Sequence, residues 1–264
     1  MSRKLALVTG ASSGIGRSLA EELAARGYDL IINSASEQLD ITAADLRKNG
    51  LDIVVLRADL ATTNGVRQLW EQISSLGRKI DVACINAGVG VGGLFIETDL
   101  DAELNMVNLN CVGTVQLSKY IVRDMVARGK GKILLTASIA GEMVAPREAV
   151  YAATKGFVLS FAHSLRYELK DTGVTVTALQ PGPTDTNFFH RAGMDNTEVG
   201  SKGKSESQPR DVARQGIDAL LAGEDHVYAA SAKTKLEGML ANVTPGVLKA
   251  TMHEKMAKPL EEHH

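Results

Sequence analysis

The feature that most constrains the fold is a regular alternation of short apolar runs with longer segments of helical periodicity. The apolar runs are nearly continuous in Leu, Ile, Val and Ala, which is typical of parallel strands covered on both faces. They are Leu5–Thr9, Leu30–Asn33, Ile53–Leu56, Val82–Asn86, Ile133–Ala137, Val174–Leu179 and Val227–Ala230. The helical segments between them are Ile15–Arg26, Glu37–Asn49, Asn64–Leu76, the stretch around Leu100–Arg128, Val150–Asp171 and Arg210–Leu221. The alternation predicts an α/β fold, a doubly wound parallel sheet of about seven strands with helices on both faces.

Two segments depart from this alternation, but no Pro- or Ser-rich linker divides the chain, so we expect a single domain over residues 1–264. Residues 187–208 are largely polar and begin with the apolar pair Phe188 and Phe189. They are interpreted either as a solvated surface loop or as a mobile lid over a ligand. Residues 232–264 form a C-terminal extension with helical patterns at Leu236–Val243 and Val247–Met256. We expect this extension to pack against the domain or to contact a second subunit.

Charge and composition exclude several classes of protein. Lys and Arg total 29 against 31 Asp and Glu, which gives a net charge of −2 and no broad attraction for nucleic acid or an anionic membrane. No apolar run reaches the ~18 residues of a membrane span, and no signal-peptide pattern precedes the first apolar run. The two cysteines, Cys84 and Cys111, suit a reducing compartment, and no His or Cys spacing resembles a metal site. We therefore expect a cytoplasmic protein that needs no metal.

The first apolar run passes directly into a glycine-rich turn, Gly10-Ala11-Ser12-Ser13-Gly14-Ile15-Gly16, and a helix follows. Gly10 permits a sharp exit from the strand, Gly14 lets the backbone approach a pyrophosphate, and Gly16 allows close packing of helix and sheet. The free N–H groups at the N-terminus of the helix attract an anion. The turn therefore predicts a dinucleotide site, which would also use Ser12, Ser13 and Ile15.

The residues after the second apolar run bear on which nucleotide binds. An Asp or Glu at this point would hold the adenosine ribose hydroxyls of NAD, but would repel the 2′-phosphate of NADP. The chain has Asn33-Ser34-Ala35-Ser36 here, and the first carboxylate is Glu37. Ser34 and Ser36 could donate hydrogen bonds to a phosphate, although no Arg or Lys stands beside them. The sequence therefore favours NADP(H) over NAD(H).

A second pattern, Tyr151-Ala152-Ala153-Thr154-Lys155, puts a phenol and an ammonium group four residues apart on one helix face. Ser138 lies thirteen residues upstream, at the end of the fifth apolar run, where open α/β sheets bind ligands. Hydride transfer to a carbonyl leaves an alkoxide that an acid must protonate. Free tyrosine titrates near pH ~10, and bringing its pKa to about 7 requires roughly 4 kcal/mol of phenolate stabilisation. We expect Lys155, helped by the positive nicotinamide of the oxidised cofactor, to supply it, and Ser138 to orient the substrate oxygen.

These motifs, in this order, resemble those of the short-chain dehydrogenases/reductases, single-domain enzymes with a Rossmann-like fold, over roughly residues 4–230. The resemblance implies that Ser138, Tyr151 and Lys155 are catalytic. It implies that Asn110 is a fourth catalytic residue, which bends its helix and holds a water beside the lysine. Asn108 is the alternative in register.

The resemblance also implies further cofactor contacts, at the adenine ring, the strand end and the nicotinamide carboxamide. In chain order these are Asp59, Leu60, Asn86, Ala87, Gly88, Pro181, Gly182, Thr184 and Thr186. Ile85 replaces the first Asn of the family's N-N-A-G motif, which puts one strand-stabilising contact in doubt. Members are frequently dimers or tetramers built through the helices that carry Asn110 and Tyr151. We therefore expect a homodimer or homotetramer.

The segments expected around the nicotinamide are mostly apolar, which suits a hydrophobic small-molecule substrate. Their side chains are Val89, Val91, Leu94, Phe95, Met143, Val144, Phe188, Phe189 and Met194, several of which could equally be core. We expect substrate contacts from Ser138, Met143, Val144, Tyr151, Phe188 and Phe189. His190 and Arg191 could bind a substrate carboxylate, but are more readily interpreted as surface loop residues.

The leading hypothesis is an oxidoreductase that moves hydride between NADP(H) and an apolar ketone, aldehyde or secondary alcohol, with Tyr151 as general acid/base. The chain looks most like bacterial carbonyl reductases within the family, and a 3-ketoacyl or hydroxysteroid reductase is an alternative. A rival from another class is a nucleotide-binding regulatory or sensing protein with incidental turnover. An epimerase or dehydratase on the same fold would need a larger substrate domain.

Overall fold

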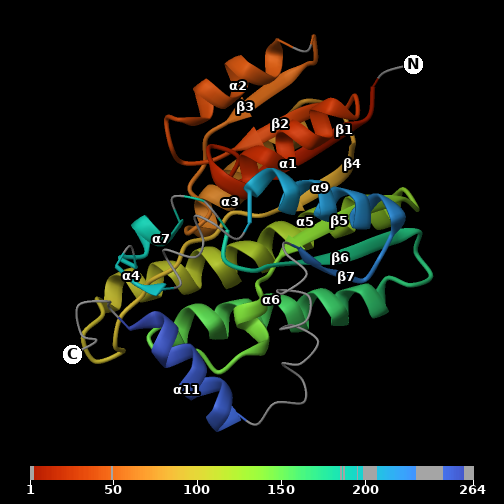
Figure 1. The fold of residues 1–264 in the computed structure, drawn as a ribbon. Helices are drawn as coiled ribbons and strands as arrows, with labels where there is room; N and C mark the ends of the chain where they lie inside the picture. Colours follow the sequence, from red (N-terminus) through yellow and green to blue (C-terminus); the bar gives the residue numbers. More distant parts are fainter. Residues whose placement is uncertain are drawn as a thin grey trace.

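The computed structural model describes residues 3–48, 50–184, 186, 188–194, 196–198, 207–229 and 246–258. Seven strands form one parallel sheet in the order β3-β2-β1-β4-β5-β6-β7. The strands are β1 (Leu5–Thr9), β2 (Asp29–Asn33), β3 (Ile53–Leu56), β4 (Ile80–Ile85), β5 (Gly131–Thr136), β6 (Val174–Pro181) and β7 (His226–Ala229). The predicted doubly wound α/β fold is confirmed (Figure 1).

Helices cover both faces of the sheet, which explains why its strands are apolar throughout. The helices α1 (Gly14–Ala25), α2 (Leu39–Arg47) and α9 (Pro209–Ala222) pack on one face, and α3 (Thr63–Ser75), α5 (Thr114–Ala127) and α6 (Ala149–Glu168) on the other. Along β1, Leu5 and Leu7 belong to the core under α3, α5 and α6, whereas Ala6 and Val8 belong to the core under α1, α2 and α9. Successive side chains of a strand point to opposite faces, so each residue is buried on one side or the other.

The strand order reverses between β1 and β4, since the chain first moves outward to β2 and β3 and then returns to the other side of β1. A crevice opens beyond the carboxyl ends of the strands at such a point, and ligands of open α/β sheets bind there. The glycine turn follows β1 at this end. The topology therefore places the predicted nucleotide site at the switch point.

The stretch around Leu100–Arg128 is helical as expected and is divided at Asn110, where the resemblance implies a bend. It consists of α4 (Leu100–Val107), a π-helical turn η1 (Asn108–Gly113) and α5. Gly113 packs closely against the strand-end loop, because a Cβ there would lie 2.3 Å from the carbonyl oxygen of Leu60. A wider π turn often marks a functional site within a helix. Here the turn carries the buried side chain of Asn110.

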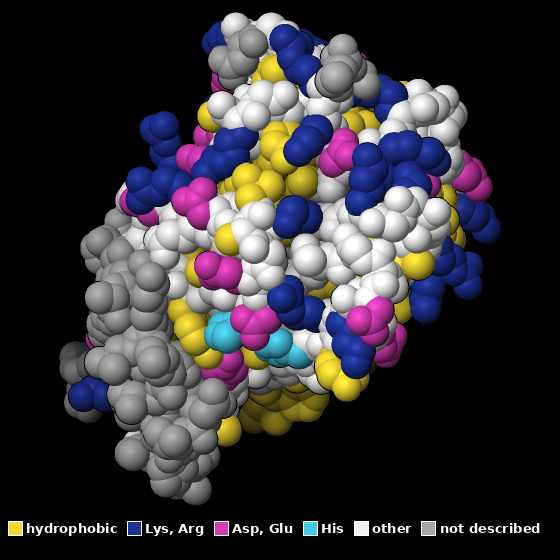
Figure 2. All heavy atoms as spheres, turned by 90° about the vertical axis from the view of Figure 1, so that its right-hand side faces the viewer, with side chains coloured by type: hydrophobic (Ala, Val, Ile, Leu, Met, Phe, Trp, Pro, Cys, Tyr) yellow, Lys and Arg dark blue, Asp and Glu magenta, His cyan; other side chains and the backbone are white. Residues whose placement is uncertain are grey.

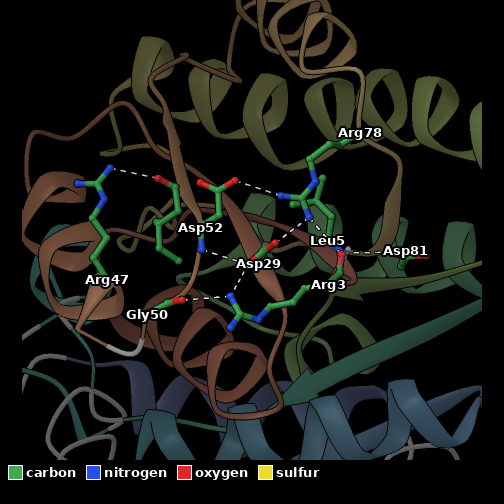
Figure 3. A network of polar contacts seen from close by, with 9 residues as sticks. Arg3, Leu5, Asp29, Arg47, Gly50, Asp52, Arg78 and Asp81 are labelled. Carbon is green, nitrogen blue, oxygen red and sulfur yellow. Dashed lines mark hydrogen bonds and ion pairs between the residues drawn. The ribbon is translucent and has the colours of Figure 1, made fainter. Parts of the chain in front are cut away.

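At the opposite, amino end of the strands a polar network ties β1, β2, β3 and β4 together (Figure 3). Asp29 accepts hydrogen bonds from the backbone N–H of Asp52 at 3.0 Å and from Arg78 Nη2 at 2.8 Å. Arg78 also reaches Asp52 Oδ2 at 3.1 Å, and Asp81 accepts from the N–H of Leu5 at 3.0 Å. The polar fastening of the sheet thus lies away from the crevice.

Both segments that depart from the alternation are described only in part. Within residues 187–208, a short helix α7 (Phe188–Arg191) is present, while 199–206 lie outside the described residues. In the C-terminal extension, the pattern at Val247–Met256 corresponds to α11 (Gly246–Ala257), and Leu236–Val243 lies outside the described residues. Figure 1 shows α11 beside the beginning of α6. The predicted packing of the extension against the domain is therefore present for α11.

On the face that Figure 2 shows, Lys and Arg side chains are interspersed with Asp and Glu side chains over the described part of the surface. Within the described residues, the longest and most apolar helices are still too short or too polar to cross a bilayer. The same residues hold no group of three His, Cys, Asp or Glu side chains arranged to bind a metal ion.

Candidate active site

The glycine turn forms a close-packed cradle at the end of β1. Gly10 and Gly14 have left-handed φ values of +67° and +54°, which favour glycine. A Cβ at Gly16 would lie 2.1 Å from the carbonyl oxygen of Gly10, so α1 begins against the turn with no room for a side chain. The N-terminus of α1 opens into a cavity of about 560 Å³. This arrangement fits a pyrophosphate held by backbone N–H groups.

Every residue that the sequence assigned to the cofactor lines this one cavity. They are Gly10, Ser12, Ser13, Gly14, Ile15, Gly16, Ser34, Ser36, Asp59, Leu60, Asn86, Ala87, Gly88, Tyr151, Lys155, Pro181, Gly182, Thr184 and Thr186. Their chain positions span most of the protein, but the carboxyl ends of five parallel strands bring them together. The cavity therefore has the extent and the lining expected of a dinucleotide site.

Hydroxyl groups cluster at the end of the cavity beyond β2. Ser34 and Ser12 form a side-chain hydrogen bond of 3.0 Å, and Ser34 Oγ accepts the N–H of Ser36 at 3.2 Å. Asn33, Ser34, Ala35 and Ser36 line the cavity here, whereas the exposed Glu37 does not. No lining residue of this segment carries a negative charge.

The departure at Ile85 leaves the contact between β1 and β4 intact. Ile85 is buried in the core, and the next two backbone N–H groups, of Asn86 and Ala87, both donate to Thr9 Oγ1 at 2.9 and 3.0 Å. The Asn86 side chain also donates to the carbonyl oxygen of Thr9 at 3.2 Å and accepts from Thr136 Oγ1 at 3.1 Å. Asn86 therefore joins β1, β4 and β5 at the edge of the crevice.

Ser138, Tyr151 and Lys155 meet on one wall of the cavity. Ser138 follows β5, and the other two lie one turn apart on α6; all three are at most 9% exposed. Lys155 Nζ donates to the carbonyl oxygen of Thr136 at 2.9 Å and lies 5.8 Å from the centre of the Tyr151 ring. Ser138 Oγ accepts the N–H of Ala140 at 3.2 Å. The phenol, the ammonium and the hydroxyl thus share the crevice with the glycine cradle.

The surroundings of Tyr151 in the protein raise the pKa of its phenol, whereas a lowered pKa was expected. Burial raises the pKa of the Tyr151 phenol above its usual value, the charge of Glu148 adds to this, and a hydrogen bond with Ser138 opposes it. Burial also lowers the pKa of Lys155 to about 8, although Cys111 raises it. The side chains around Tyr151 therefore do not by themselves make the phenol acidic, and the expected contribution of the oxidised nicotinamide stays a prediction. Desolvation is the larger effect because α6 presents both side chains to a closed part of the crevice.

Asn110, in the π turn, is almost fully buried and reaches toward the lysine. Its side chain accepts from the N–H of Val89 at 3.0 Å and donates to the carbonyl oxygen of Val89 at 2.9 Å and to Thr154 Oγ1 at 3.0 Å. A Cβ placed on Gly88 would lie 3.1 Å from Asn110 Oδ1 and 3.5 Å from Lys155 Nζ. Asn108, the alternative in register, is exposed. The structure thus brings Asn110, and not Asn108, to the cavity wall that carries Tyr151 and Lys155.

The segment after β6 closes over the glycine cradle. A Cβ on Gly14 would lie 3.0 Å from Thr186 Cγ2, so Thr186 faces Gly14 across the crevice. Thr184 Oγ1 donates to the carbonyl oxygen of Gly182 at 2.8 Å, and Thr186 Oγ1 accepts the N–H of Phe188 at 3.2 Å. These contacts hold the segment that the resemblance assigned to the nicotinamide carboxamide.

Apolar side chains form the remaining end of the cavity, though not all those expected. Met143, Phe188 and Phe189 line it, with the Phe188 ring 5.2 Å from that of Tyr151. Val144 is 48% exposed and lies outside the lining, so the structure does not bring it together with the other expected substrate residues. Its neighbour Met143 takes the inward position, because the backbone there is extended and alternate side chains point apart.

Other candidates for this end are also distributed differently. Val89 lines the cavity, whereas Val91, Leu94, Phe95 and Met194 do not. Phe95 is 65% exposed, and Met194 is buried against Gly92. His190 is exposed outside the lining, and the side chain of Arg191 lies outside what the structure describes.

Among the lining residues that sequence reasoning missed are Glu148, His253 and Met256. Glu148 is three residues before Tyr151, so a helical periodicity argument could have placed it on the same face. His253 and Met256 belong to α11, about a hundred residues away in the chain, and no local pattern connects them with the site. The C-terminal extension therefore contributes to the cavity wall.

The chain matches the model of the short chain dehydrogenase family over residues 4–197. It belongs to that family. It is 35% identical to an uncharacterized oxidoreductase, YmfI, of Bacillus subtilis over 193 residues, 71% of this chain and 78% of that protein. Among solved structures, a short-chain dehydrogenase from Sphingobium yanoikuyae in complex with NADPH has a TM-score of 0.79 at 28% identity, covering 85% of this chain and 87% of the other.

A second solved structure is the bulky-bulky ketone specific alcohol dehydrogenase from Comamonas testosteroni, with a TM-score of 0.75 at 25% identity, covering 92% of this chain and 93% of the other. From family membership and the cavity together, we conclude that this short-chain dehydrogenase is a nicotinamide-dependent oxidoreductase acting on CH–OH groups.

Proposed function

We propose that this short-chain dehydrogenase reduces apolar ketones or aldehydes with NADPH, and oxidises the matching secondary alcohols, with Tyr151 as general acid/base. One observation carries the proposal: Ser138, Tyr151 and Lys155 line the same cavity as the glycine cradle, and apolar side chains close its far end. A regulatory nucleotide-binding protein would not need this set of buried polar side chains facing a second, apolar compartment.

In this mechanism the nicotinamide of the bound cofactor supplies the hydride. Ser138 donates a hydrogen bond to the substrate carbonyl oxygen, which orients it toward Tyr151. Tyr151 then gives its proton to the developing alkoxide, a far stronger base than a phenolate. The raised pKa of Tyr151 suits this direction because the phenol stays protonated at neutral pH. Lys155, fixed by the Thr136 carbonyl, supplies positive charge beside the site, and Asn110 holds the backbone at Val89 next to it.

The preference for NADP(H) is supported by the residues around the expected ribose. The lining after β2 is uncharged, and the Ser12–Ser34 pair offers hydroxyl donors to a 2′-phosphate. The relative from Sphingobium yanoikuyae, whose structure contains NADPH, is consistent with this preference. The apolar substrate class is supported by Met143, Phe188 and Phe189, and the similarity to a ketone-specific alcohol dehydrogenase agrees with it.

The proposal is tested by Tyr151→Phe, which removes the phenolic hydroxyl and keeps the ring against Phe188. We expect kcat for ketone reduction to fall by about 10³-fold, the contribution typical of a positioned general acid. NADPH binding, measured by fluorescence titration, should be unchanged. Tyr120→Phe is the matched control, since Tyr120 stacks on Trp70 at 5.7 Å and does not line the cavity. Near-wild-type turnover of Tyr151→Phe would refute the role of the phenol.

The same titration tests the cofactor. We expect the Kd for NADPH to be about tenfold or more below that for NADH, because two or three hydroxyl and backbone donors can bond the additional phosphate. A Kd for NADH that equals or lies below that for NADPH would defeat this part of the proposal and leave the role of Tyr151 standing.

A further inference from the structure

The C-terminal helix α11 is fastened to the three residues that precede the catalytic helix α6. His253 Nδ1 lies 3.1 Å from the carbonyl oxygen of Pro146, and His253 Nε2 lies 3.0 Å from Glu148 Oε2. Arg147 donates to Glu254 at 3.0 Å and has a left-handed φ of +65°, a strained conformation for a residue other than glycine. Residues 146–148 and 253–254 thus form one polar junction at the wall of the cavity.

The hydrogen bonds of this junction determine where its protons lie. The Pro146 carbonyl can only accept, so His253 Nδ1 carries a hydrogen. One further proton must lie between Nε2 and Glu148 Oε2, either on the ring or on the carboxyl group. In both arrangements the second oxygen, Glu148 Oε1, remains a hydrogen-bond acceptor.

Among the described residues, none donates a hydrogen bond to this second oxygen. Glu148 is 5% exposed and His253 4% exposed, and both line the cavity that holds Tyr151. Within the described part of the chain, His253 is the one side chain that bonds to the Glu148 carboxyl group. Glu148 Oε1 is not one of the described side-chain atoms that are both fully enclosed and without a hydrogen-bond partner. Because it has no such partner, it must be accessible from the cavity. A buried acceptor of this kind needs a donor, and a ligand that displaces water from the cavity can supply it.

We propose that Glu148 is a specificity-determining residue, whose free carboxyl oxygen accepts a hydrogen bond from a hydroxyl group on the substrate, away from the reacting carbonyl. This inference rests on the proposed ketone reduction and names the substrate class more closely, as a hydroxylated ketone or aldehyde. The surrounding lining of Met256, Phe188 and Phe189 is apolar, so the position of the hydroxyl is restricted to the side facing Glu148. A site built to bond a substrate hydroxyl discriminates strongly against analogues that lack it, because the buried partner is then left unpaired.

The probes are acetophenones substituted at the meta or para position with a hydroxyl group, and the corresponding methoxy compounds. A methoxy group has similar electronic effects but cannot donate a hydrogen bond. We expect the wild-type kcat/KM for at least one hydroxy compound to exceed that for its methoxy partner about tenfold, the worth of one additional hydrogen bond. An acetyl benzoate should be the poorest of the series, because its carboxylate meets the same acceptor.

Three variants separate recognition from support of the fold. Glu148→Met keeps the side-chain volume and removes both oxygens, so the hydroxyl preference should disappear while the methoxy compound is still reduced. Glu148→Gln can donate to His253 Nε2 and keep its own oxygen toward the cavity, so it should restore most of the preference. Glu254→Gln weakens the contact with Arg147, does not line the cavity and should leave the preference unchanged.

Equal kcat/KM values for both members of each wild-type pair would overturn the inference and leave the proposed function in place. If Glu148→Met keeps the preference for the hydroxy compound, or if Glu254→Gln loses it as well, the inference is wrong. The polar junction would then serve only to hold α11 in place. If no acetophenone is reduced, acetophenones are not substrates, and the proposed function is decided separately by other ketones and aldehydes. The subsite is then decided by binding, as the rise in Tm caused by each hydroxy and methoxy compound at saturating NADPH. A larger rise for the hydroxy compound in wild type than in Glu148→Met supports it, and equal rises refute it.

Discussion

Lys155 shows how strongly one residue's surroundings can change its chemistry. Lys155 is 6% exposed, and its ammonium group donates to the carbonyl oxygen of Thr136 and lies close to Asn110 and Gly88. Desolvation lowers the pKa of this lysine to about 8 from the 10.5 of a free side chain. Keeping Lys155 charged at neutral pH therefore lowers the free energy of unfolding of the protein.

The lowered free energy of unfolding predicts a pH-dependent difference in stability between wild type and Lys155→Met. Below pH 8 both folded and unfolded wild-type chains hold the proton, and the full penalty applies. Between pH 8 and 10.5 the folded state releases its proton first, so wild type should gain up to about 3 kcal/mol relative to the variant. Urea unfolding across this pH range measures the difference. A difference that stays constant with pH would show that the ammonium is not desolvated.

The two ends of the sheet have different roles: one forms the cavity and the other joins the strands. The carboxyl ends of the strands carry short turns that form the cavity, whereas the amino ends are joined by the network around Asp29. Desolvation opposes ionisation of Asp29, but bonds from Asp52 N–H and Arg78 outweigh it and hold the pKa of Asp29 below its usual value. The network therefore stabilises the alignment of β1 to β4 while the opposite end remains available for ligand.

Removing this charge should destabilise the sheet in a pH-dependent way. We expect Asp29→Asn to lower the free energy of unfolding by about 2 kcal/mol at pH 7, the cost of weakening a largely buried charged hydrogen bond. Because the folded pKa lies below the unfolded one, this contribution is present above pH ~4 and is lost as the pH falls through the folded pKa. Denaturant unfolding at pH 7 and pH 3 provides the measurement.

Asp40→Asn is the control for this prediction, since Asp40 pairs with Arg57 at an exposed position, 63% and 46% accessible. An exposed pair contributes less than about 1 kcal/mol. Equal losses in the two variants would contradict the importance of burial at Asp29.

For the whole molecule, apolar side chains remain exposed on the face that carries α5 and α6. Phe157 is 44% exposed and stacks on Phe161 at 6.2 Å, and Val112 and Val126 are 42% and 37% exposed. Large side chains of this kind, gathered on neighbouring helices, are typical of a protein–protein interface. The resemblance to the family led us to expect a homodimer or homotetramer through these helices.

Light scattering on the purified chain should therefore give a mass at twice or four times that of one chain. Phe157→Glu should reduce this mass, because a charge would be buried without a partner in the interface. Ile41→Glu, at a 59% exposed position on α2, should not. A monomeric wild type would show that these helices form no subunit interface. An unchanged mass in Phe157→Glu would show that the interface lies elsewhere on the protein.

The sequence by itself determined the sheet, the glycine cradle and the set Ser138, Tyr151 and Lys155, because these depend on local spacing. A strand that ends in a glycine turn needs only neighbouring residues to be recognised, and a phenol and an amine four apart share a helix face. Boundaries shifted by one to three residues, since helix ends depend on capping and packing that periodicity does not report.

The tertiary structure alone decided four matters. It gave the bend that the resemblance implies at Asn110 the form of a π turn, because the turn makes contacts with Val89 and Leu60 that are distant in the sequence. It turned Val144 outward, and it raised the pKa of Tyr151, since burial is a property of the assembled crevice. It also brought His253 of α11 to Glu148, more than a hundred residues earlier. Local patterns encode which way a side chain faces on its own element, but only packing between elements determines what it meets.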